Sequence, residues 1–163
     1  MSSVLGLDVG TSGTKAIAMN AEGKLLASAL VEYPLYSPKP NWAEQDPADW
    51  KRAAFDALKQ LAGRINPREV KALGLTGQMH GSVFLDAKNQ VLRNALLWCD
   101  QRTADQCAAI TEKVGEKRLL EMVSNPALTG FTAPKILWLR DHEPALYDRL
   151  KKVLLPKDYI RFE

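Results

Sequence analysis

The sequence predicts an α/β fold in which a three-stranded meander opens a mixed sheet that helices flank. Three observations support this class. Short apolar runs alternate with glycine-containing turns up to residue 33, a pattern that is typical of antiparallel strands. A longer stretch with helical spacing follows. Residues 70–75 then form another short apolar run, and because a helix separates it from the first strand, the two can pair in parallel.

The first part of the chain is expected to form three consecutive strands. Residues 4–9 and 14–19 carry apolar side chains at every second or third position, and a glycine-rich turn over 10–13 joins them. A second turn over 20–23 supplies a glycine for positive φ, and residues 24–33 continue as the third strand. These strands together make the meander.

A long helix is expected to begin at Asp46 and Pro47. Asp is a favoured N-cap residue, and Pro suits the first helical position because its missing N–H would have no partner there. Apolar residues keep helical spacing up to Leu61, and Gly63 followed by Pro67 ends the pattern. This helix is the crossover that allows the next strand to lie parallel to the first.

The second half of the chain is expected to contain a small hairpin, several helices and one more strand. Residues 83–85 and 91–97 flank a turn over 86–89 and are predicted to pair with each other. Thr103 is expected to cap a helix that runs to Val114. The remaining predicted elements are a helix from Pro134 to Arg140, a strand at 153–155 and a segment that begins at Pro156.

This element order is typical of ribonuclease-H-like domains, the fold of the actin-like ATPases. The chain has 163 residues, a length that suits a single hydrophobic core, so we expect one domain over residues 1–163. Fold alone does not give function, because one fold hosts many activities.

Composition and charge narrow the class of partner. The chain is 46% hydrophobic and 25% charged, which is ordinary for a globular protein. Its net charge is +3, and its Lys and Arg are dispersed among acidic residues, so nucleic-acid binding is not expected. Neither a basic leader nor a membrane-spanning run is recognisable, so we expect a cytoplasmic protein without a membrane partner, with Cys99 and Cys107 reduced.

The glycine-rich turn is the strongest candidate for a phosphate-binding site. Its glycines let successive backbone N–H groups point toward one ligand, and its hydroxyl side chains add donors. Asp8, expected at the end of a buried strand, is suited to hold Mg²⁺ directly or through water. A plain hairpin is the alternative, although it would need neither the hydroxyls nor a buried acid such as Asp8 is expected to be. The candidate phosphate-binding residues are Gly10, Thr11, Ser12, Gly13 and Thr14.

Five stretches resemble the sugar-kinase branch of the actin-like ATPases, which includes glycerol kinases, gluconate kinases and xylulokinases. Residues 6–15 resemble its first phosphate motif, and residues 41–50 resemble its first helix entry. Residues 77–81, Gly-Gln-Met-His-Gly, are similar to the sugar-contacting loop in its xylulokinase form. Residues 98–103 resemble the stretch in which a Trp lies against a polyol, and residues 130–139 resemble a signature helix. The resemblance spans nearly the whole chain.

The resemblance implies a sugar pocket that contains Gln78, Met79 and His80. These residues follow the predicted parallel strand, at the end where sheets of this type place ligands. A His can donate to and accept from hydroxyl groups, and Met offers an adaptable apolar wall. A ring held by backbone groups in a turn is the alternative for His80. The resemblance also implies that Trp98 covers the carbon face of the sugar, with core packing an equal alternative.

Other charged and aromatic residues are expected to have structural roles. Asp100 and Arg102 are predicted to form an ion pair. Lys135, near a helix start, is expected to be solvated or to cap the helix. The tryptophans expected in the core are Trp42, Trp50 and Trp138.

The resemblance implies that the parent enzyme uses ATP and Mg²⁺ to phosphorylate a ketopentose, in the first place D-xylulose, giving D-xylulose 5-phosphate. Another ketose or a polyol is the alternative substrate, and a non-catalytic actin-like nucleotide-binding module is an alternative of another class. The catalytic Asp base is expected in a C-terminal domain that the 163 residues lack. The isolated chain is therefore expected to be inactive. Apolar surface that the C-terminal domain would cover is then exposed, and its self-association would give a homodimer.

Overall fold

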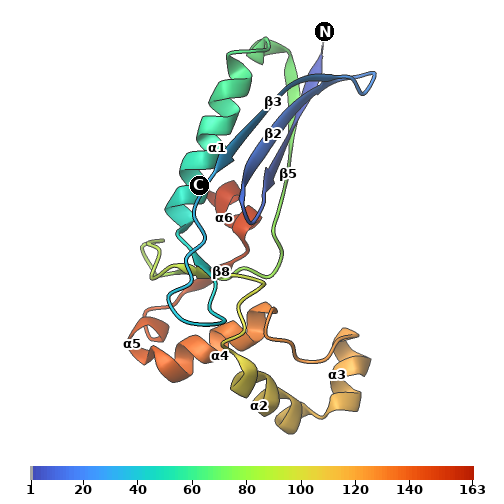
Figure 1. Ribbon diagram of the computed structural model, residues 1–163. Coiled ribbons are helices and arrows are strands. Elements are labelled where there is room, and N and C mark those ends of the chain that lie inside the picture. Colours follow the sequence, from blue (N-terminus) through green and yellow to red (C-terminus); the bar gives the residue numbers. More distant parts are fainter. Residues whose placement is uncertain (1) are drawn as a thin grey trace. The chain divides into compact units, whose positions relative to one another are not determined.

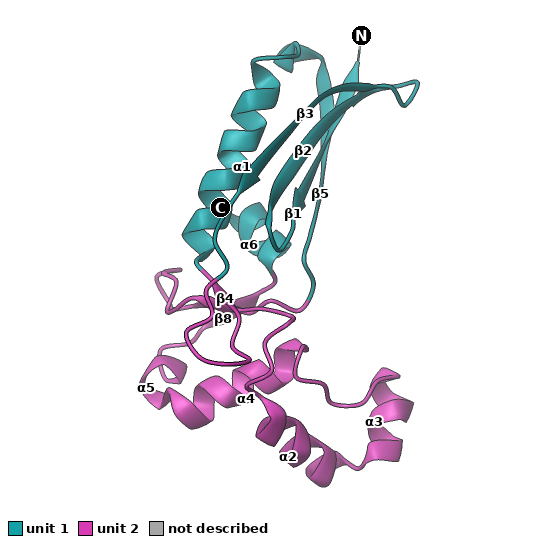
Figure 2. Ribbon diagram, viewed as in Figure 1, with its two compact units in different colours: residues 1–35, 46–79, 156–163 teal, residues 36–45, 80–155 magenta. Residues whose placement is uncertain are grey.

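The computed structural model describes residues 2–163, which divide into two compact units (Figure 2). Unit 1 combines the N-terminal strands with segments 46–79 and 156–163. Unit 2 combines segments 36–45 and 80–155. The chain therefore passes from one unit to the other four times, which is why the sequence shows no single linker between them.

Unit 1 is built on a four-stranded sheet with the order β3-β2-β1-β5 (Figure 1). The predicted meander consists of β1 (Ser3–Val9), β2 (Gly13–Asn20) and β3 (Leu25–Glu32), which pair antiparallel in sequence. β5 (Val70–Gly77) pairs with β1 in parallel. The mixed sheet predicted from the apolar runs is confirmed.

The helix α1 (Pro47–Ala62) begins and ends as the sequence predicts. Asp46 is the N-cap, and its side chain accepts a hydrogen bond from the N–H of Ala48 at 2.9 Å. Gly63 is the C-cap residue. The unit also contains a short 3₁₀ helix, Pro67–Glu69, and α6 (Pro156–Phe162).

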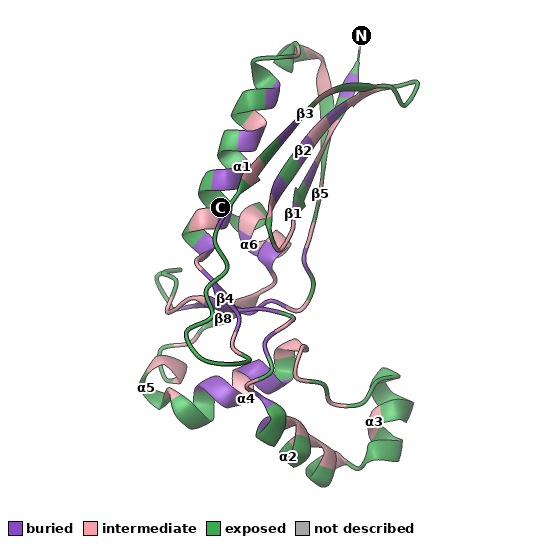
Figure 3. Cartoon of the chain, viewed as in Figure 1, coloured by how far each residue is buried: buried purple, intermediate pink, exposed green. Residues whose placement is uncertain are grey.

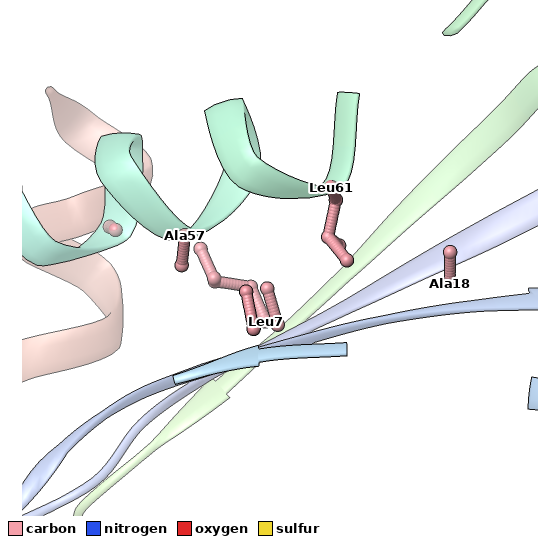
Figure 4. Close-up of a cluster of buried hydrophobic side chains, with 7 residues drawn as sticks. Leu7, Ala18, Ala57 and Leu61 are labelled. Atoms are coloured by element: carbon pink, nitrogen blue, oxygen red, sulfur yellow. The ribbon is translucent and has the colours of Figure 1, made fainter. Parts of the chain in front are cut away.

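The core of unit 1 lies between α1 and one face of the sheet (Figure 4). Leu7 of β1 and Ala18 of β2 lie on the sheet side, and Ala57 and Leu61 project from α1. Each of these four side chains is at most 2% exposed. Small alanines on both surfaces let the helix approach the sheet closely, and this burial of apolar area holds the two layers together.

Unit 2 consists of short strands and helices. β4 (Glu44–Gln45) pairs with β7 (Ala95–Leu96), and β6 (Val83–Leu85) pairs with β8 (Lys152–Leu154). Its helices are α2 (Ala104–Val114), α3 (Glu116–Val123), α4 (Thr132–His142) and α5 (Pro144–Tyr147).

Buried residues of unit 2 concentrate on the short strands and on α4, whereas α2 and α3 are mostly exposed (Figure 3). Phe84, Leu96, Trp138 and Leu139 form its apolar core. Trp138 is thus buried as predicted, and Trp50 is fully buried in α1, whereas Trp42 is only partly buried.

Two local predictions for unit 2 need correction. The predicted hairpin is confirmed only in part: Leu85 bridges Val91 and the N–H of Leu92 donates to the carbonyl of Phe84, but β6 and β7 take their strand partners from distant parts of the chain. Thr103 precedes α2, but its hydroxyl donates to the carbonyl of Thr129 at 3.3 Å and makes no capping hydrogen bond. Both errors arise because tertiary partners compete with local pairing.

Within residues 2–163, none of the helices has the length and apolar character that a membrane crossing would need.

Candidate functional site

The turn between β1 and β2 is a tight loop closed by a backbone hydrogen bond. The N–H of Gly10 donates to the carbonyl of Gly13 at 3.1 Å. A Cβ at position 13 would lie 2.8 Å from the carbonyl oxygen of Val31, a distance that real Cβ atoms do not reach. Glycine is therefore required here by the close approach of β3.

The carbonyl of Gly10 is held from two sides. It accepts one hydrogen bond from the hydroxyl of Tyr33. It accepts another from the side-chain amide of Gln78, at 3.2 Å. The backbone N–H of Gln78 donates to the carbonyl of Val9 at 2.8 Å. These bonds fix the loop to the end of β5 and to the residue that follows β3.

The side chain of Gln78 thus faces the β1–β2 loop, whereas the sequence assigned it to the sugar pocket. The parallel pairing of β1 and β5 explains this position, because the ends of the two strands lie at the same edge of the sheet. Tyr33 was not singled out from the sequence. The sequence indicated its position only indirectly, through the predicted meander: the antiparallel pairing of β2 and β3 brings the end of β3 back to the loop.

Tyr33 is buried, and this burial sets its ionisation. Burial, and to a lesser extent the charge of Asp8, raises the pKa of Tyr33 to about 12. The hydroxyl therefore stays protonated and keeps its donor role at neutral pH. Thr14, which lies beside Tyr33, is also fully buried, so its hydroxyl does not face a ligand at the loop surface as was expected.

Asp8 is exposed, which corrects the expectation of a buried acid. Leu7 and Val9 point into the core, and because side chains alternate along a strand, Asp8 lies on the opposite face of the sheet. The strand register places it beside Lys15 of β2 and Thr76 of β5. These three residues line a cleft of about 390 Å³, whose other lining residues are Gly6, Leu7, Ile17, Gly74 and Leu75.

The donor set around Asp8 fits a magnesium ion better than a structural metal. Within residues 2–163, no three His, Cys, Asp or Glu side chains gather in a group that could hold a metal ion. Mg²⁺ commonly uses only one or two protein carboxylates and completes its shell with phosphate oxygens and water. A single exposed carboxylate such as Asp8 satisfies this requirement, whereas zinc usually needs three or four side chains.

His80 has an unusual backbone and a confined ring. Its φ of 59° lies in the left-handed region. Its ring lies against that of Phe131, with 4.6 Å between centroids and 52° between planes. Burial, together with the charge of Lys135, lowers the pKa of His80. The imidazole is therefore mainly neutral near pH 7 and offers one donor and one acceptor.

Trp98 and Met79 are both exposed, at 47% and 63% respectively. At this exposure Trp98 does not belong to the apolar core of unit 2. The backbone of Trp98 is nevertheless closely packed, because a Cβ at Gly130 would lie only 2.6 Å from the carbonyl oxygen of Trp98. Glycine at position 130 lets the segment before α4 approach the Trp98 backbone this closely.

Asp100 and Arg102 form the predicted ion pair, and both side chains are almost completely buried. The Nη2 of Arg102 lies 2.7 Å from a carboxylate oxygen of Asp100. The same carboxylate accepts a hydrogen bond from the backbone N–H of Ala43 at 2.7 Å. The pair therefore joins the segment after Trp98 to the segment that leads into β4.

The charge network extends beyond this pair. Arg102 also donates to Glu44 at 2.7 Å, and Glu44 in turn pairs with Arg93. Arg93 also pairs with Glu143. The guanidinium carbon of Arg102 lies 3.5 Å from the ring centroid of Trp42, an arrangement that favours a cation–π interaction. Each charged side chain of this network thus has a partner of opposite charge, as buried ions require.

Lys135 is buried, which corrects the expectation of a solvated side chain. It is fully buried in α4, and its Nζ donates to the carbonyl of His80 at 2.8 Å and to the carbonyl of Gly130. Burial lowers the pKa of Lys135 to about 8, although the negative charge of Asp100 opposes the shift. The ammonium group is still mainly charged near pH 7.

The sequence of the chain is similar to those of known carbohydrate kinases. Residues 3–163 match the family model described as the FGGY family of carbohydrate kinases, N-terminal domain. The chain is 44% identical over 164 residues to the xylulose kinase of Bacillus subtilis (strain 168), covering 99% of the chain and 33% of that protein. It is 46% identical over 157 residues to the xylulose kinase of Klebsiella pneumoniae, covering 96% of the chain and 32% of that protein.

A solved structure gives the same result for the fold. The crystal structure of xylulose kinase from Rhodospirillum rubrum superposes with a TM-score of 0.94 at 31% identity, covering 98% of the chain and 33% of that protein. The predicted fold class and the resemblance to sugar kinases are confirmed by these matches. The chain spans about a third of the length of the relatives that it matches.

We expect Arg102→Met to destabilise the chain by about 3–5 kcal/mol, because it leaves the buried carboxylate of Asp100 without its ionic partner. Urea unfolding measures this loss. Arg140→Met is the matched control, since Arg140 forms an exposed pair with Asp141 and its removal should have little effect. A loss for Arg102→Met no larger than that of the control would contradict the role of the network.

We also expect Tyr33→Phe to change how stability depends on alkaline pH. The folded chain holds the Tyr33 proton up to about pH 12, whereas the ordinary value is 10.0, so this contribution is complete below pH 10 and is lost as pH rises toward 12. Relative to the wild type, the variant should therefore gain stability over that range. A difference in unfolding free energy that is constant from pH 8 to 12 would show that Tyr33 ionises normally.

Proposed function

The chain belongs to the FGGY family of carbohydrate kinases as its N-terminal domain, and from this premise we propose that it forms part of a kinase for D-xylulose. The reaction would transfer the γ-phosphate of ATP to the sugar and give D-xylulose 5-phosphate and ADP. D-xylulose is proposed as the sugar because the chain is 44% identical to a xylulose kinase over 99% of its length. Because ATP is a substrate, the proposal places the enzyme in the cytoplasm.

In this proposal the β1–β2 loop holds the phosphates of ATP. Backbone N–H groups in a tight glycine turn can bind successive phosphate oxygens. Tyr33 and Gln78 would preserve the shape of the loop, because both hold the carbonyl of Gly10. Asp8 would hold Mg²⁺, and the ion would neutralise charge on the transferring phosphoryl group.

The sugar would bind to unit 2 through His80 and Trp98. A neutral imidazole can donate to one hydroxyl of a sugar and accept from its neighbour. The exposed face of an indole can cover sugar C–H groups. The exposure of Trp98 supports this role, since the buried Trp50 and Trp138 offer no such face.

The catalytic base is proposed to come from the remainder of the enzyme. Asp100 is unsuitable, because its carboxylate is fully buried and paired with Arg102. Asp158 lies in the first turn of α6 and pairs with Lys157 at 2.7 Å, which gives it a structural role. With the base and a second domain supplied elsewhere, this chain would bind and orient the two substrates for in-line transfer, the main source of rate in phosphoryl transfer.

Asp8→Asn in the complete kinase is expected to lower kcat by about a hundredfold or more, while the affinity for D-xylulose and the unfolding temperature change little. The reason is that the carboxylate would act on charge that develops in the transition state. A coupled assay of ADP release measures kcat. Asp56→Asn, an exposed position in α1, is the control. An unchanged kcat at saturating Mg²⁺ would remove Asp8 from the site.

His80→Ala in the complete kinase is expected to weaken D-xylulose binding by about 1–3 kcal/mol, roughly tenfold to hundredfold, and to leave ATP binding unchanged. The loss arises because a sugar hydroxyl would keep no partner. Isothermal titration calorimetry with each ligand tests this. His142→Ala, at the other histidine of these 163 residues, is the control. Equal affinity for D-xylulose in the wild type and the His80 variant would refute the sugar contact.

A further inference from the structure

We propose that Lys135 is a positioning residue of the sugar pocket, whose ammonium group fixes the backbone of His80 and thereby the direction of the imidazole. The proposal rests on the proposed function, since it takes His80 to be a sugar contact. Lys135 itself is fully buried and donates to the backbone of His80, so it acts through His80.

The backbone of His80 needs an external hold. Its φ of 59° is disfavoured for residues with a side chain, because the Cβ crowds the following carbonyl oxygen. The chain at this point lies between the end of β5 and the start of β6, outside any ladder that would impose the conformation. Without a specific partner, this backbone would relax to an ordinary conformation, and the ring would then project elsewhere.

Two side chains from the first turn of α4 supply that hold. Lys135 Nζ donates to the carbonyl of His80 at 2.8 Å, and the hydroxyl of Thr132 donates to the same oxygen at 3.3 Å. Together they use both lone pairs of the oxygen. Because the peptide group is planar, fixing this carbonyl fixes the plane after His80 and limits where its Cβ can point. The ring of Phe131 then confines the imidazole.

The same ammonium group also reaches the second proposed sugar contact. Lys135 Nζ donates to the carbonyl of Gly130, and the backbone of Gly130 packs directly against the carbonyl of Trp98. The ammonium group of Lys135 therefore connects the segment that carries His80 with the Gly130 segment, which packs against the backbone of Trp98. A change at Lys135 should accordingly affect the geometry of both contacts.

Stability alone does not explain a lysine at this position. A buried ammonium loses its hydration, and an apolar residue of similar size would pack there without that cost. The compensation observed is specific: two carbonyl oxygens accept from the amine, and the charge of Asp100 favours the cation. Both carbonyls belong to the segments that carry or support the pocket.

The test is a double-mutant cycle on the complete kinase with Lys135→Met and His80→Ala, read out by calorimetry with D-xylulose and with ATP. Lys135→Met alone should weaken D-xylulose binding by about tenfold and leave ATP binding within about twofold. In the His80→Ala background the same substitution should have a much smaller effect, because the group that it positions is gone. Lys113→Met, an exposed position on α2, is the matched control.

Each outcome separates this inference from the function on which it rests. Unchanged D-xylulose affinity in Lys135→Met, or an equal loss with and without His80, would overturn the positioning role while leaving the kinase proposal intact. No effect of His80→Ala alone would overturn the sugar contact and the positioning role with it. If Lys135→Met does not fold, Thr132→Val replaces it, with a smaller loss expected that again depends on His80.

Discussion

The buried carboxylate of Asp100 is the group on which the arrangement of unit 2 depends. It accepts from the N–H of Ala43 and from the side chain of Arg102, and its charge favours the ammonium form of Lys135. A buried charge is tolerated only when its partners are in place, so these segments must assemble together. Trp98, two residues before Asp100, is held at the surface as a consequence.

Different interactions determine the structure of the candidate site in each of the two units. The β1–β2 loop of unit 1 depends on close backbone approach, which glycine permits at position 13, and on an apolar core that keeps α1 on the sheet. The proposed sugar contacts depend instead on side chains whose directions are set by buried polar groups of unit 2. Backbone N–H groups suit phosphate oxygens, whereas hydroxyl recognition needs side chains with both donors and acceptors.

Features set by local chemistry could be predicted from the sequence. The meander and the limits of α1 follow from turn glycines, from the cap at Asp46 and from Gly63. The pairing of β6 with β8 could not, because it joins segments far apart in sequence. The alternation of apolar side chains around Asp8 already indicated its exposure, but the acid was taken to be buried. Nothing local indicated the partners of Lys135 and Gln78, since these are backbone oxygens brought near only by the fold. The roles of the loop and of His80 in binding stay predictions.

The most direct test of this account is fluorine NMR of the complete kinase labelled with 5-fluorotryptophan, titrated with D-xylulose. Replacing each tryptophan of this chain by Phe assigns the four resonances. The account predicts that D-xylulose shifts the resonance of the exposed Trp98 and leaves those of the buried Trp50 and Trp138 in place. A Trp98 resonance that does not move at saturating D-xylulose would contradict the sugar-binding role of unit 2.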